Sequence, residues 1–250
     1  MVTDCLLSTR ALHKAFGAVV ASEALSLQVR RGEVHALIGP NGAGKTTVIN
    51  QLSGEIAPDA GSIHFDGRDI TAYSADRRAR LGLARTFQVS TLFDAMSVSE
   101  NLALGVLPRL GHSYRFWRRA RGDARLMEPV RELLARLELD ALAEQRAGSL
   151  AHGDRRRLEL AMALAGEPSM LLLDEPMAGT GPESSREIAR LLAGLKGQVT
   201  VLLVEHDMDV VFAVADTISV MVAGRCIASG PPASVRADPQ VRRAYLGEDD

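Results

Sequence analysis

The sequence predicts an α/β fold interrupted by a helical insert, and three features of its hydrophobic pattern support this. An apolar run at 34–38 precedes a glycine-rich loop and a segment with helical spacing. Helical periodicity then dominates 91–165, after which continuous apolar runs return. Because such runs are typical of strands buried on both faces of a parallel sheet, we expect one core formed by two stretches of chain, 1–90 and 166–230. Residues 231–250 are expected to form a peripheral segment that closes the single domain.

The first part of the chain alternates short strands with glycine turns. Leu25–Val29 alternate apolar and polar residues, and Val34–Ile38 form an apolar strand that stops at Gly39. Helical spacing over Thr46–Leu52 then predicts a strand–loop–helix unit. Gly61–Gly67 predicts a further strand bounded by glycine turns.

Helical spacing of apolar residues marks the middle of the chain, at Val130, Leu133, Leu134, Leu137 and Leu142. Arginines and glutamates lie between them, as expected for the solvent-facing side of helices. This pattern predicts the inserted helical subdomain.

Strands return in the last part of the chain. Met170–Leu173 is a continuous apolar run, Val199–Val204 is apolar apart from Thr200, and Ile218–Val222 supplies a further strand. A helix is predicted at 187–195, between the first two of these strands. We therefore expect these strands to complete the parallel sheet begun by the N-terminal part.

The overall charge argues against a nucleic-acid-binding protein. A net charge of −2 and a pI near 6.3 give no reason to expect nucleic-acid binding through bulk charge. The stretch Pro108–Arg125 is rich in arginine and carries Tyr114, Phe116 and Trp117, which a nucleic-acid or membrane surface would explain. We favour an exposed basic face of the helical insert, because charge elsewhere offsets it.

The chain carries no signal for secretion or membrane insertion. Its N-terminus lacks the basic start and apolar core of a signal peptide, and no window reaches the roughly 20 apolar residues needed to cross a bilayer. Cys5 and Cys226 lie far apart without neighbouring histidine or cysteine, so we expect free thiols in a reducing compartment. A cytosolic location is expected, with any membrane attachment made through a partner.

The glycine-rich loop at 39–46 matches the pattern G-x-x-x-x-G-K-[ST] between a strand and a helix. Glycines allow backbone amides to approach phosphate oxygens, and the helix N-terminus favours the same anion. Lys45 would reach the β- and γ-phosphates of ATP, and the Thr46 hydroxyl would bind Mg²⁺. The alternative is a plain glycine turn. The predicted ATP-contacting residues are Gly39, Pro40, Asn41, Gly42, Ala43, Gly44, Lys45, Thr46 and Thr47.

Two acidic residues end the apolar run 170–173. Ligands of open α/β sheets bind at the carboxyl ends of the strands, where Asp174 and Glu175 fall. Asp174 is predicted to bind magnesium through water, and Glu175 to polarise the water that attacks the γ-phosphate. Two acids after a strand are weak evidence alone, but the loop at Lys45 strengthens it.

Gln88 and His206 complete the predicted catalytic set of Glu175, His206, Gln88 and Lys45. Gln88 lies where the core passes into the helical insert, and His206 follows the strand ending at Val204. A lone glutamine or histidine is more often structural. Both, however, fall at boundaries where the phosphate site is expected, and Gln88 is also a predicted metal ligand beside Thr46 and Asp174.

The segment Leu150–Glu159 resembles the signature motif of ABC transporter ATPases, which separates this family from other P-loop NTPases. The resemblance spans nearly the whole chain. It implies a RecA-like P-loop core with an N-terminal antiparallel β subdomain and an inserted α-helical subdomain. It also implies that two subunits enclose two ATP molecules head to tail, with Gly153 contacting the partner's nucleotide in trans, and that Phe16 stacks on adenine.

Two positions depart from the family pattern. Ala151 replaces the usual serine of the signature, so Ala151 is not expected to contact phosphate. Gly181 stands where an aspartate or asparagine normally precedes the proline, and that residue helps one ATP site report to the other. These departures question the cross-dimer contacts, whereas the presence of Glu175 and His206 indicates a site competent for hydrolysis.

Further segments resemble the ATPases of branched-chain amino-acid uptake systems, namely the basic insert, Asn101–Leu102 and 241–248. Urea and lipopolysaccharide transport ATPases share several of these features. The resemblance implies integral-membrane permease subunits as partners, a second identical or sister ATPase subunit, an indirect link to a solute-binding protein, and a position on the cytoplasmic face of the inner membrane. It implies no nucleic-acid partner.

Two alternatives belong to other classes. Soluble ABC ATPases of DNA repair or translation typically carry two cassettes, long coiled coils or added domains, which this chain lacks. A P-loop kinase of small metabolites would leave Leu150–Glu159 and His206 without a role. We therefore expect an ATP-hydrolysing subunit that drives import of branched-chain amino acids.

Overall fold

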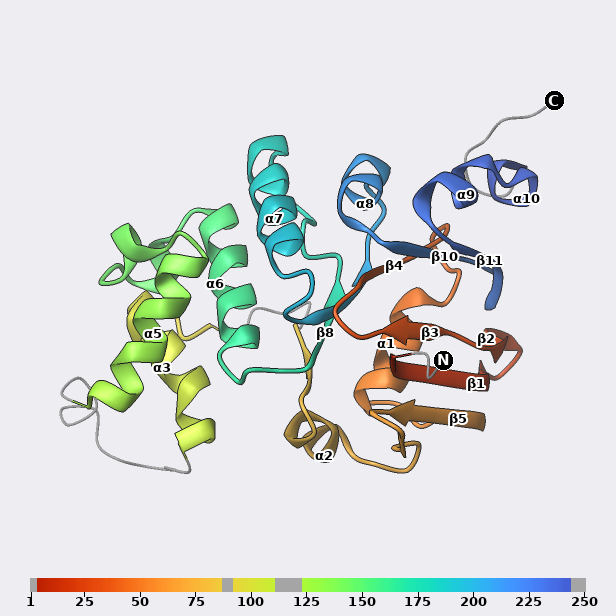
Figure 1. The fold of residues 1–250 in the computed structure, drawn as a ribbon, viewed down its shortest axis with the longest axis horizontal. Coiled ribbons are helices and arrows are strands. Elements are labelled where there is room, and N and C mark those ends of the chain that lie inside the picture. The colour runs from red at the N-terminus through yellow and green to blue at the C-terminus, as the bar shows by residue number, and fades with distance from the viewer. Residues whose placement is uncertain (1–3, 87–91, 111–122, 244–250) are drawn as a thin grey trace.

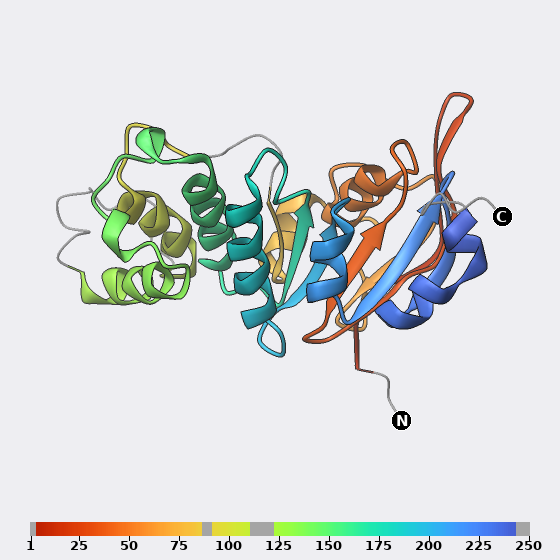
Figure 2. The ribbon, with the colours of Figure 1, turned by 90° about the horizontal axis from the view of Figure 1, so that it is seen from above.

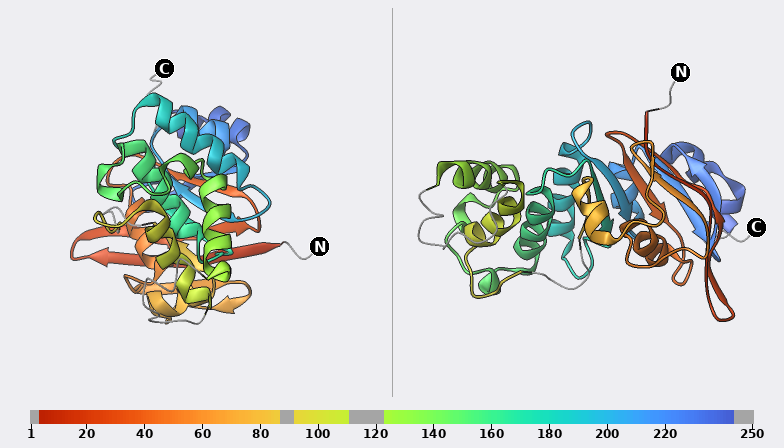
Figure 3. Two further views of the ribbon diagram at one scale, coloured as in Figure 1. Left: turned by 90° about the vertical axis from the view of Figure 1, so that its left-hand side faces the viewer. Right: turned by 90° about the horizontal axis from the view of Figure 1, so that it is seen from below.

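The computed structural model describes residues 4–86, 92–110 and 123–243. Within these ranges the chain forms two sheets and a group of helices at one end of an elongated molecule (Figures 1, 2 and 3). The predicted α/β fold class is confirmed by this arrangement.

Five parallel strands and one antiparallel edge strand form the larger sheet, in the order β11-β10-β4-β9-β8-β7. Their bounds are β4 Val34–Ile38, β7 Leu83–Arg85, β8 Met170–Asp174, β9 Thr200–Val204, β10 Thr217–Val222 and β11 Arg225–Gly230. Because β4, β8 and β9 are adjacent and parallel, their carboxyl ends meet at one edge of the sheet, where the predicted phosphate-handling residues follow.

The smaller sheet is antiparallel and comes from the N-terminal part of the chain. Its order is β2-β1-β5-β6, with β3 also paired to β1. The strands are β1 Cys5–Phe16, β2 Val19–Leu25, β3 Gln28–Arg30, β5 Ala60–Phe65 and β6 Arg68–Asp69. The expected single strand at 25–29 is interrupted, because β2 ends at Leu25, β3 begins at Gln28, and the two pair with different parts of β1.

Helix α1 (Lys45–Ser53) joins the two sheets through a shared apolar core. Val48, Ile49 and Leu52 of α1 are fully buried in one cluster with residues of β1, β5 and β8. Alternate residues of β8 face opposite ways, so Met170 and Leu172 pack in this cluster while Leu171 and Leu173 pack with α7 and α8. These helices span Pro182–Gly194 and Met208–Val214.

Helix α7 begins five residues before its predicted start, at Pro182 rather than residue 187. Proline is favoured at the first position of a helix because its fixed φ suits the helix and its missing N–H has no intrahelical partner there. The polar first turn of α7 hid this start from a search for apolar spacing.

Three longer helices form the helical part, namely α3 (Val98–Val106), α5 (Ala124–Arg136) and α6 (His152–Leu164). Short helices η1 (Leu107–Leu110), η2 (Asp140–Leu142) and η3 (Ala147–Ser149) connect them. Their apolar faces meet in one cluster that continues onto β8 and α7. The aromatic residues Tyr114, Phe116 and Trp117 lie outside the described residues.

The C-terminal helices α9 (Pro232–Ala237) and α10 (Pro239–Val241) pack on β10 and β11 through Val235 and Val241, which are both buried (Figure 1). In the described ranges, no helix has the length and apolar character that a membrane span requires.

Near the site, α2 (Ala75–Arg80) is fixed to the end of α1 by the buried side chain of Arg78. Arg78 Nη1 donates to the carbonyl oxygens of Gln51 and Leu52, at 2.6 and 2.7 Å, and its other nitrogens donate to Thr71 and Tyr73. Carbonyls at a helix C-terminus lack intrahelical partners, so a cation there is favourable. Arg78 thereby holds α1 in register with the chain that leads to β7.

Candidate nucleotide-binding site

The glycine-rich loop connects β4 to α1 and requires glycine for two different reasons. A Cβ on Gly39 would lie 2.1 Å from the carbonyl oxygen of Met221, and one on Gly44 would lie 1.9 Å from that of Ala21. Gly42 has a φ of +80° but open space where its Cβ would be. The outer glycines therefore allow the loop to contact neighbouring strands, whereas Gly42 satisfies the turn of the loop itself.

Lys45 is buried and folds back over the loop. Its Nζ donates to the carbonyl oxygens of Gly39 at 2.7 Å and Pro40 at 3.0 Å. Burial lowers the pKa of Lys45 below its usual value, and the negative charges of Glu175 and Asp174 oppose this. The ammonium group thus lies against the loop and feels the charges of the two acids that follow the apolar run of β8.

Asp174 ends β8 with its side chain fully shielded from solvent. Burial raises the pKa of its carboxyl group, while the charges of Arg85 and Lys45 and a hydrogen bond from the Thr46 side chain lower it. Thr46 and Asp174, two of the predicted magnesium ligands, therefore lie against each other. Hydroxyl and carboxylate oxygens are hard ligands of the kind Mg²⁺ prefers, so this donor set fits the ion.

Glu175 follows Asp174 in a strained backbone conformation, with a φ of +51°. Its N–H donates to the Val204 carbonyl at 2.9 Å, which fixes Glu175 beside the end of β9. There, His206 Nδ1 lies 4.0 Å from Glu175 Oε1. Non-glycine residues in this conformation are uncommon and cluster at functional sites. The structure brings together the predicted base and the predicted histidine.

Glu205 is a residue of the site that sequence analysis missed. Its side chain is 1 % exposed, and it accepts hydrogen bonds from the N–H groups of Met177, at 3.0 Å, and His206, at 3.2 Å. Burial raises the pKa of Glu205, and these two hydrogen bonds lower it. Glu205 thus ties the loop after β8 to the loop after β9. A charged residue directly after an apolar strand was the available signal.

Phe16 lies at the tip of the β1–β2 hairpin, which projects from the body of the molecule in Figure 2. Its side chain is 50 % exposed, so packing in the core does not explain it. Lys14 Nζ lies 5.5 Å from the ring centroid and also pairs with Asp59 at 2.7 Å. An exposed ring held this way provides a flat surface for stacking. Gln88, the remaining predicted catalytic residue, lies outside the described residues.

The signature segment forms the start of α6, with Ala151 as N-cap and Gly153 as the second residue of the helix. A Cβ on Gly153 would lie 2.4 Å from Ser184 Oγ, so this glycine also lets α6 approach α7 closely. His152 Nε2 lies 3.4 Å from the Ala178 carbonyl oxygen. Figure 1 places α6 among the helices at one end of the molecule, away from the loop between β4 and α1.

Gly181 is the N-cap of α7 and no side chain replaces the expected aspartate or asparagine. Contacts of Thr180 with nearby residues hold the loop that precedes Gly181. Thr180 Oγ1 donates to the Met177 carbonyl at 2.7 Å and lies 2.9 Å from Ser185 Oγ. The loop therefore has an ordered shape despite its departure from the family pattern.

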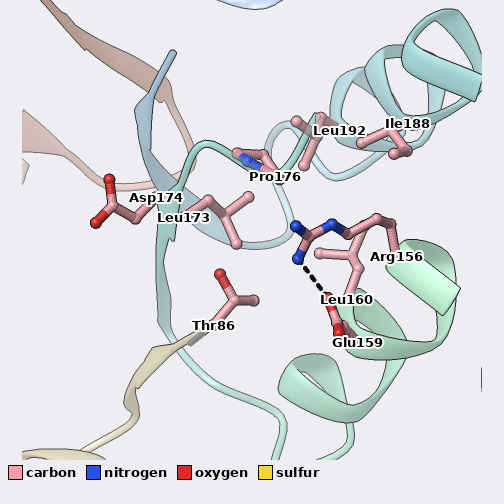
Figure 4. Close-up of a pocket in the computed structure, with 9 residues that line it drawn as sticks. All are labelled: Thr86, Arg156, Glu159, Leu160, Leu173, Asp174, Pro176, Ile188 and Leu192. Atoms are coloured by element: carbon pink, nitrogen blue, oxygen red, sulfur yellow. Dashed lines mark hydrogen bonds and ion pairs between the residues drawn. The ribbon is translucent and has the colours of Figure 1, made fainter. Parts of the chain in front are cut away.

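A small cavity of about 20 Å³ separates the signature helix from the end of β8 (Figure 4). Arg156 of α6 points toward it and pairs with Glu159 at 2.8 Å, while Thr86, Leu173 and Pro176 enclose the other side. A space of this size holds about one water molecule. Helix α6 thus meets the core next to Asp174 through a loosely filled, partly polar contact.

Comparison with known proteins shows the family. The ABC transporter family profile matches residues 22–178, which include the glycine-rich loop, the signature segment and Asp174-Glu175. The chain belongs to the ABC transporter family. As a member of it, the chain is an ATP-binding and ATP-hydrolysing cassette. A second profile, described as "Branched-chain amino acid ATP-binding cassette transporter", matches residues 225–250.

Two relatives that match along almost their whole length are also named as branched-chain amino acid transport ATP-binding proteins. This ABC cassette is 40 % identical to the high-affinity branched-chain amino acid transport ATP-binding protein LivG of Salmonella typhimurium, covering 97 % of the chain and 98 % of the relative. It is 38 % identical to BraF of Pseudomonas aeruginosa, with the same coverage and a corresponding name. The crystal structure of a nucleotide-free ATP-binding cassette from an ABC transporter matches with a TM-score of 0.84 and 33 % identity, covering 98 % and 100 % of the two chains. The recognised family and the fold class are therefore confirmed.

Proposed function

We propose that this ABC cassette is the ATPase subunit of an importer for branched-chain amino acids. The observation that supports it most is the matching of residues 225–250 to the branched-chain subfamily, together with relatives of that name along the whole chain. The edge of the sheet supplies the hydrolysis site, because Lys45, Asp174 and Glu175 gather there.

In the proposed reaction, each of these side chains has a distinct role. Lys45 exchanges its bonds to the Gly39 and Pro40 carbonyls for bonds to the β- and γ-phosphates. Thr46 and Asp174 would hold Mg²⁺, with Gln88 as a further predicted ligand, and the bound ion would supply positive charge that neutralises the phosphates. Glu175 polarises the attacking water, and His206 contacts the γ-phosphate from the neighbouring strand end.

The site is proposed to be completed by a second ATPase subunit, identical or a sister chain. The N-terminus of α6 carries Gly153 and partial positive charge from its unpaired N–H groups, which suits a γ-phosphate held by the partner. The signature helix and Gly179 are in contact through His152, so both would move together when the dimer closes.

A permease helix is proposed to dock between the core and the helical part. A cavity of about 440 Å³ lies there, and its lining includes the apolar residues Leu83, Ala84 and Met162 and the charged residues Glu55 and Arg85. This docking would place the subunit on the cytoplasmic face of the inner membrane, and would link it indirectly to a solute-binding protein. We propose no nucleic-acid partner.

Uptake measurements test the proposed substrate. Deleting the gene in its source organism should lower uptake of labelled leucine, isoleucine and valine at least about tenfold, and the wild-type gene but not Glu175→Gln should restore it. Normal branched-chain uptake with lost urea uptake, or with defective lipopolysaccharide export, would contradict the assignment and favour a related ABC system.

Phe16 is proposed to stack on adenine. Replacing it by alanine should raise the Kd for ATP about tenfold, since a base–aromatic stack contributes about 1–3 kcal/mol, whereas Phe16→Tyr should leave the Kd within about twofold. Binding of a fluorescent ATP analogue labelled on its ribose measures both variants. An unchanged Kd in Phe16→Ala would place adenine elsewhere. Val19, also exposed at 67 %, offers a matched control in Val19→Thr.

A further inference from the structure

Arg85 lies between the cavity proposed to receive the permease and Asp174, a predicted magnesium ligand. It ends β7 and pairs in register with Leu172 of β8, so its side chain lies on the same face of the sheet as Asp174, two residues further along β8. That face is covered by α1. Arg85 Nη1 donates to Asn50 Oδ1 of α1 at 2.6 Å, so the guanidinium lies between the helix and the strand.

Two carboxylates flank this guanidinium at different depths. Arg85 Nη1 donates to Glu55 Oε2 at 2.8 Å, and Arg85 Nη2 lies 3.6 Å from Asp174 Oδ2. The exposed fractions of the three side chains fall from 36 % for Glu55 to 9 % for Arg85 and 0 % for Asp174. Glu55 lines the cavity. The three side chains therefore form a row that begins at a surface open to a partner and ends at Asp174, the predicted metal ligand.

We propose that Glu55, Arg85 and Asp174 form an electrostatic relay by which the occupant of the cavity changes metal binding at Asp174. The relay rests on the proposed function, since it assumes that Asp174 serves Mg²⁺ and that a permease segment occupies the cavity. Arg85 is a positioning residue, because it acts through Asp174 and does not touch the nucleotide.

The sign of the relay follows from the charges. A cation 3.6 Å from a metal-binding carboxylate competes with the metal for its negative charge. Glu55 draws part of that positive charge toward the surface. When a cationic group of the docked segment pairs with Glu55, Arg85 is released toward Asp174 and the metal is held less tightly. Burial keeps this effect strong, since solvent screens little of it at Asp174.

Substitutions at the two ends of the relay should therefore act in opposite directions. Arg85→Met removes the competing cation and should tighten Mn²⁺ binding about tenfold. Glu55→Gln leaves Arg85 free to turn toward Asp174 and should weaken Mn²⁺ binding about threefold. In the double variant the path through Arg85 is gone, so its Kd should equal that of Arg85→Met alone.

The experiment is a titration of Mn²⁺ into the full chain with bound ADP, in which electron paramagnetic resonance reports the bound ion without turnover. Arg85→Lys keeps the cation and should bind Mn²⁺ within about twofold of the wild type, which separates charge from loss of folding. Arg31 provides a matched control away from the site, because it also pairs with two carboxylates, Asp4 and Asp66. Arg31→Met should leave the Kd unchanged.

Three results would overturn the relay. Weaker binding in both Arg85→Met and Glu55→Gln would indicate structural damage alone. Additive effects in the double variant would indicate that Glu55 acts directly on the metal. Unchanged Kd values with normal wild-type binding would refute the relay and leave the proposed function intact, whereas a wild-type chain that binds neither ADP nor Mn²⁺ would refute the nucleotide site and the relay with it.

Discussion

Replacing Glu175 by glutamine is expected to lower kcat for ATP hydrolysis by at least about 100-fold, because a positioned general base contributes about 10²–10⁴-fold. The amide cannot accept a proton from water, yet it has nearly the same shape. The Kd for ATP should therefore change little. With ATP held and not consumed, the variant should elute as a dimer in size-exclusion chromatography when ATP and Mg²⁺ are present, and as a monomer when they are removed.

Glu138 supplies the matched control for this experiment. Its backbone also has a positive φ, +55°, and its side chain is 64 % exposed and lies just after α5, in the helical part. Glu138→Gln should hydrolyse ATP at the wild-type rate. Full turnover in Glu175→Gln would show that another group activates the water. His206, whose Nδ1 lies 4.0 Å from Glu175 Oε1, would then be the first candidate to test by substitution.

Most of the fold was predictable because the informative patterns are local. Val34–Ile38 is apolar apart from His35, and Met170–Leu173 is apolar without interruption, since both faces of their sheet are covered, and such runs are visible in the sequence. The split between β2 and β3 was not predictable, since it depends on which part of β1 each strand pairs with. Pairing partners are far apart along the chain, and no local pattern specifies them.

The site shows the same division. Lys45, Asp174 and Glu175 were predictable because each motif fixes its own residue. The contacts of Arg85 and Glu205 were not predicted because they depend on neighbours from other elements: Arg85 on Asn50 and Glu55, Glu205 on the loop after β8. Both have a signal in the sequence, a charged residue at the end of a buried strand, but that signal does not name the partner.

Gly44→Ala is expected to destabilise the cassette by about 3 kcal/mol or to prevent folding. Two effects add. The φ of +100° is unfavourable for any residue with a Cβ, and that Cβ would lie 1.9 Å from the Ala21 carbonyl oxygen. Ala21 belongs to β2, whose neighbour β1 cannot yield without disturbing the antiparallel sheet. Urea denaturation followed by circular dichroism should show a lower midpoint, or the variant should accumulate only as insoluble protein.

Gly42→Ala separates the two effects, since Gly42 shares the left-handed conformation, with a φ of +80°, but has open space around its Cβ position. Only backbone strain remains there, so we expect the free energy of unfolding to fall by about 1 kcal/mol. If the urea midpoints of the two variants coincide, the contact between the loop and Ala21 contributes nothing, and backbone strain alone explains the need for glycine. A markedly lower midpoint for Gly44→Ala means that this loop is held in shape by the β1–β2 hairpin. The same hairpin carries Phe16, so adenine stacking and phosphate binding are then coupled through one sheet.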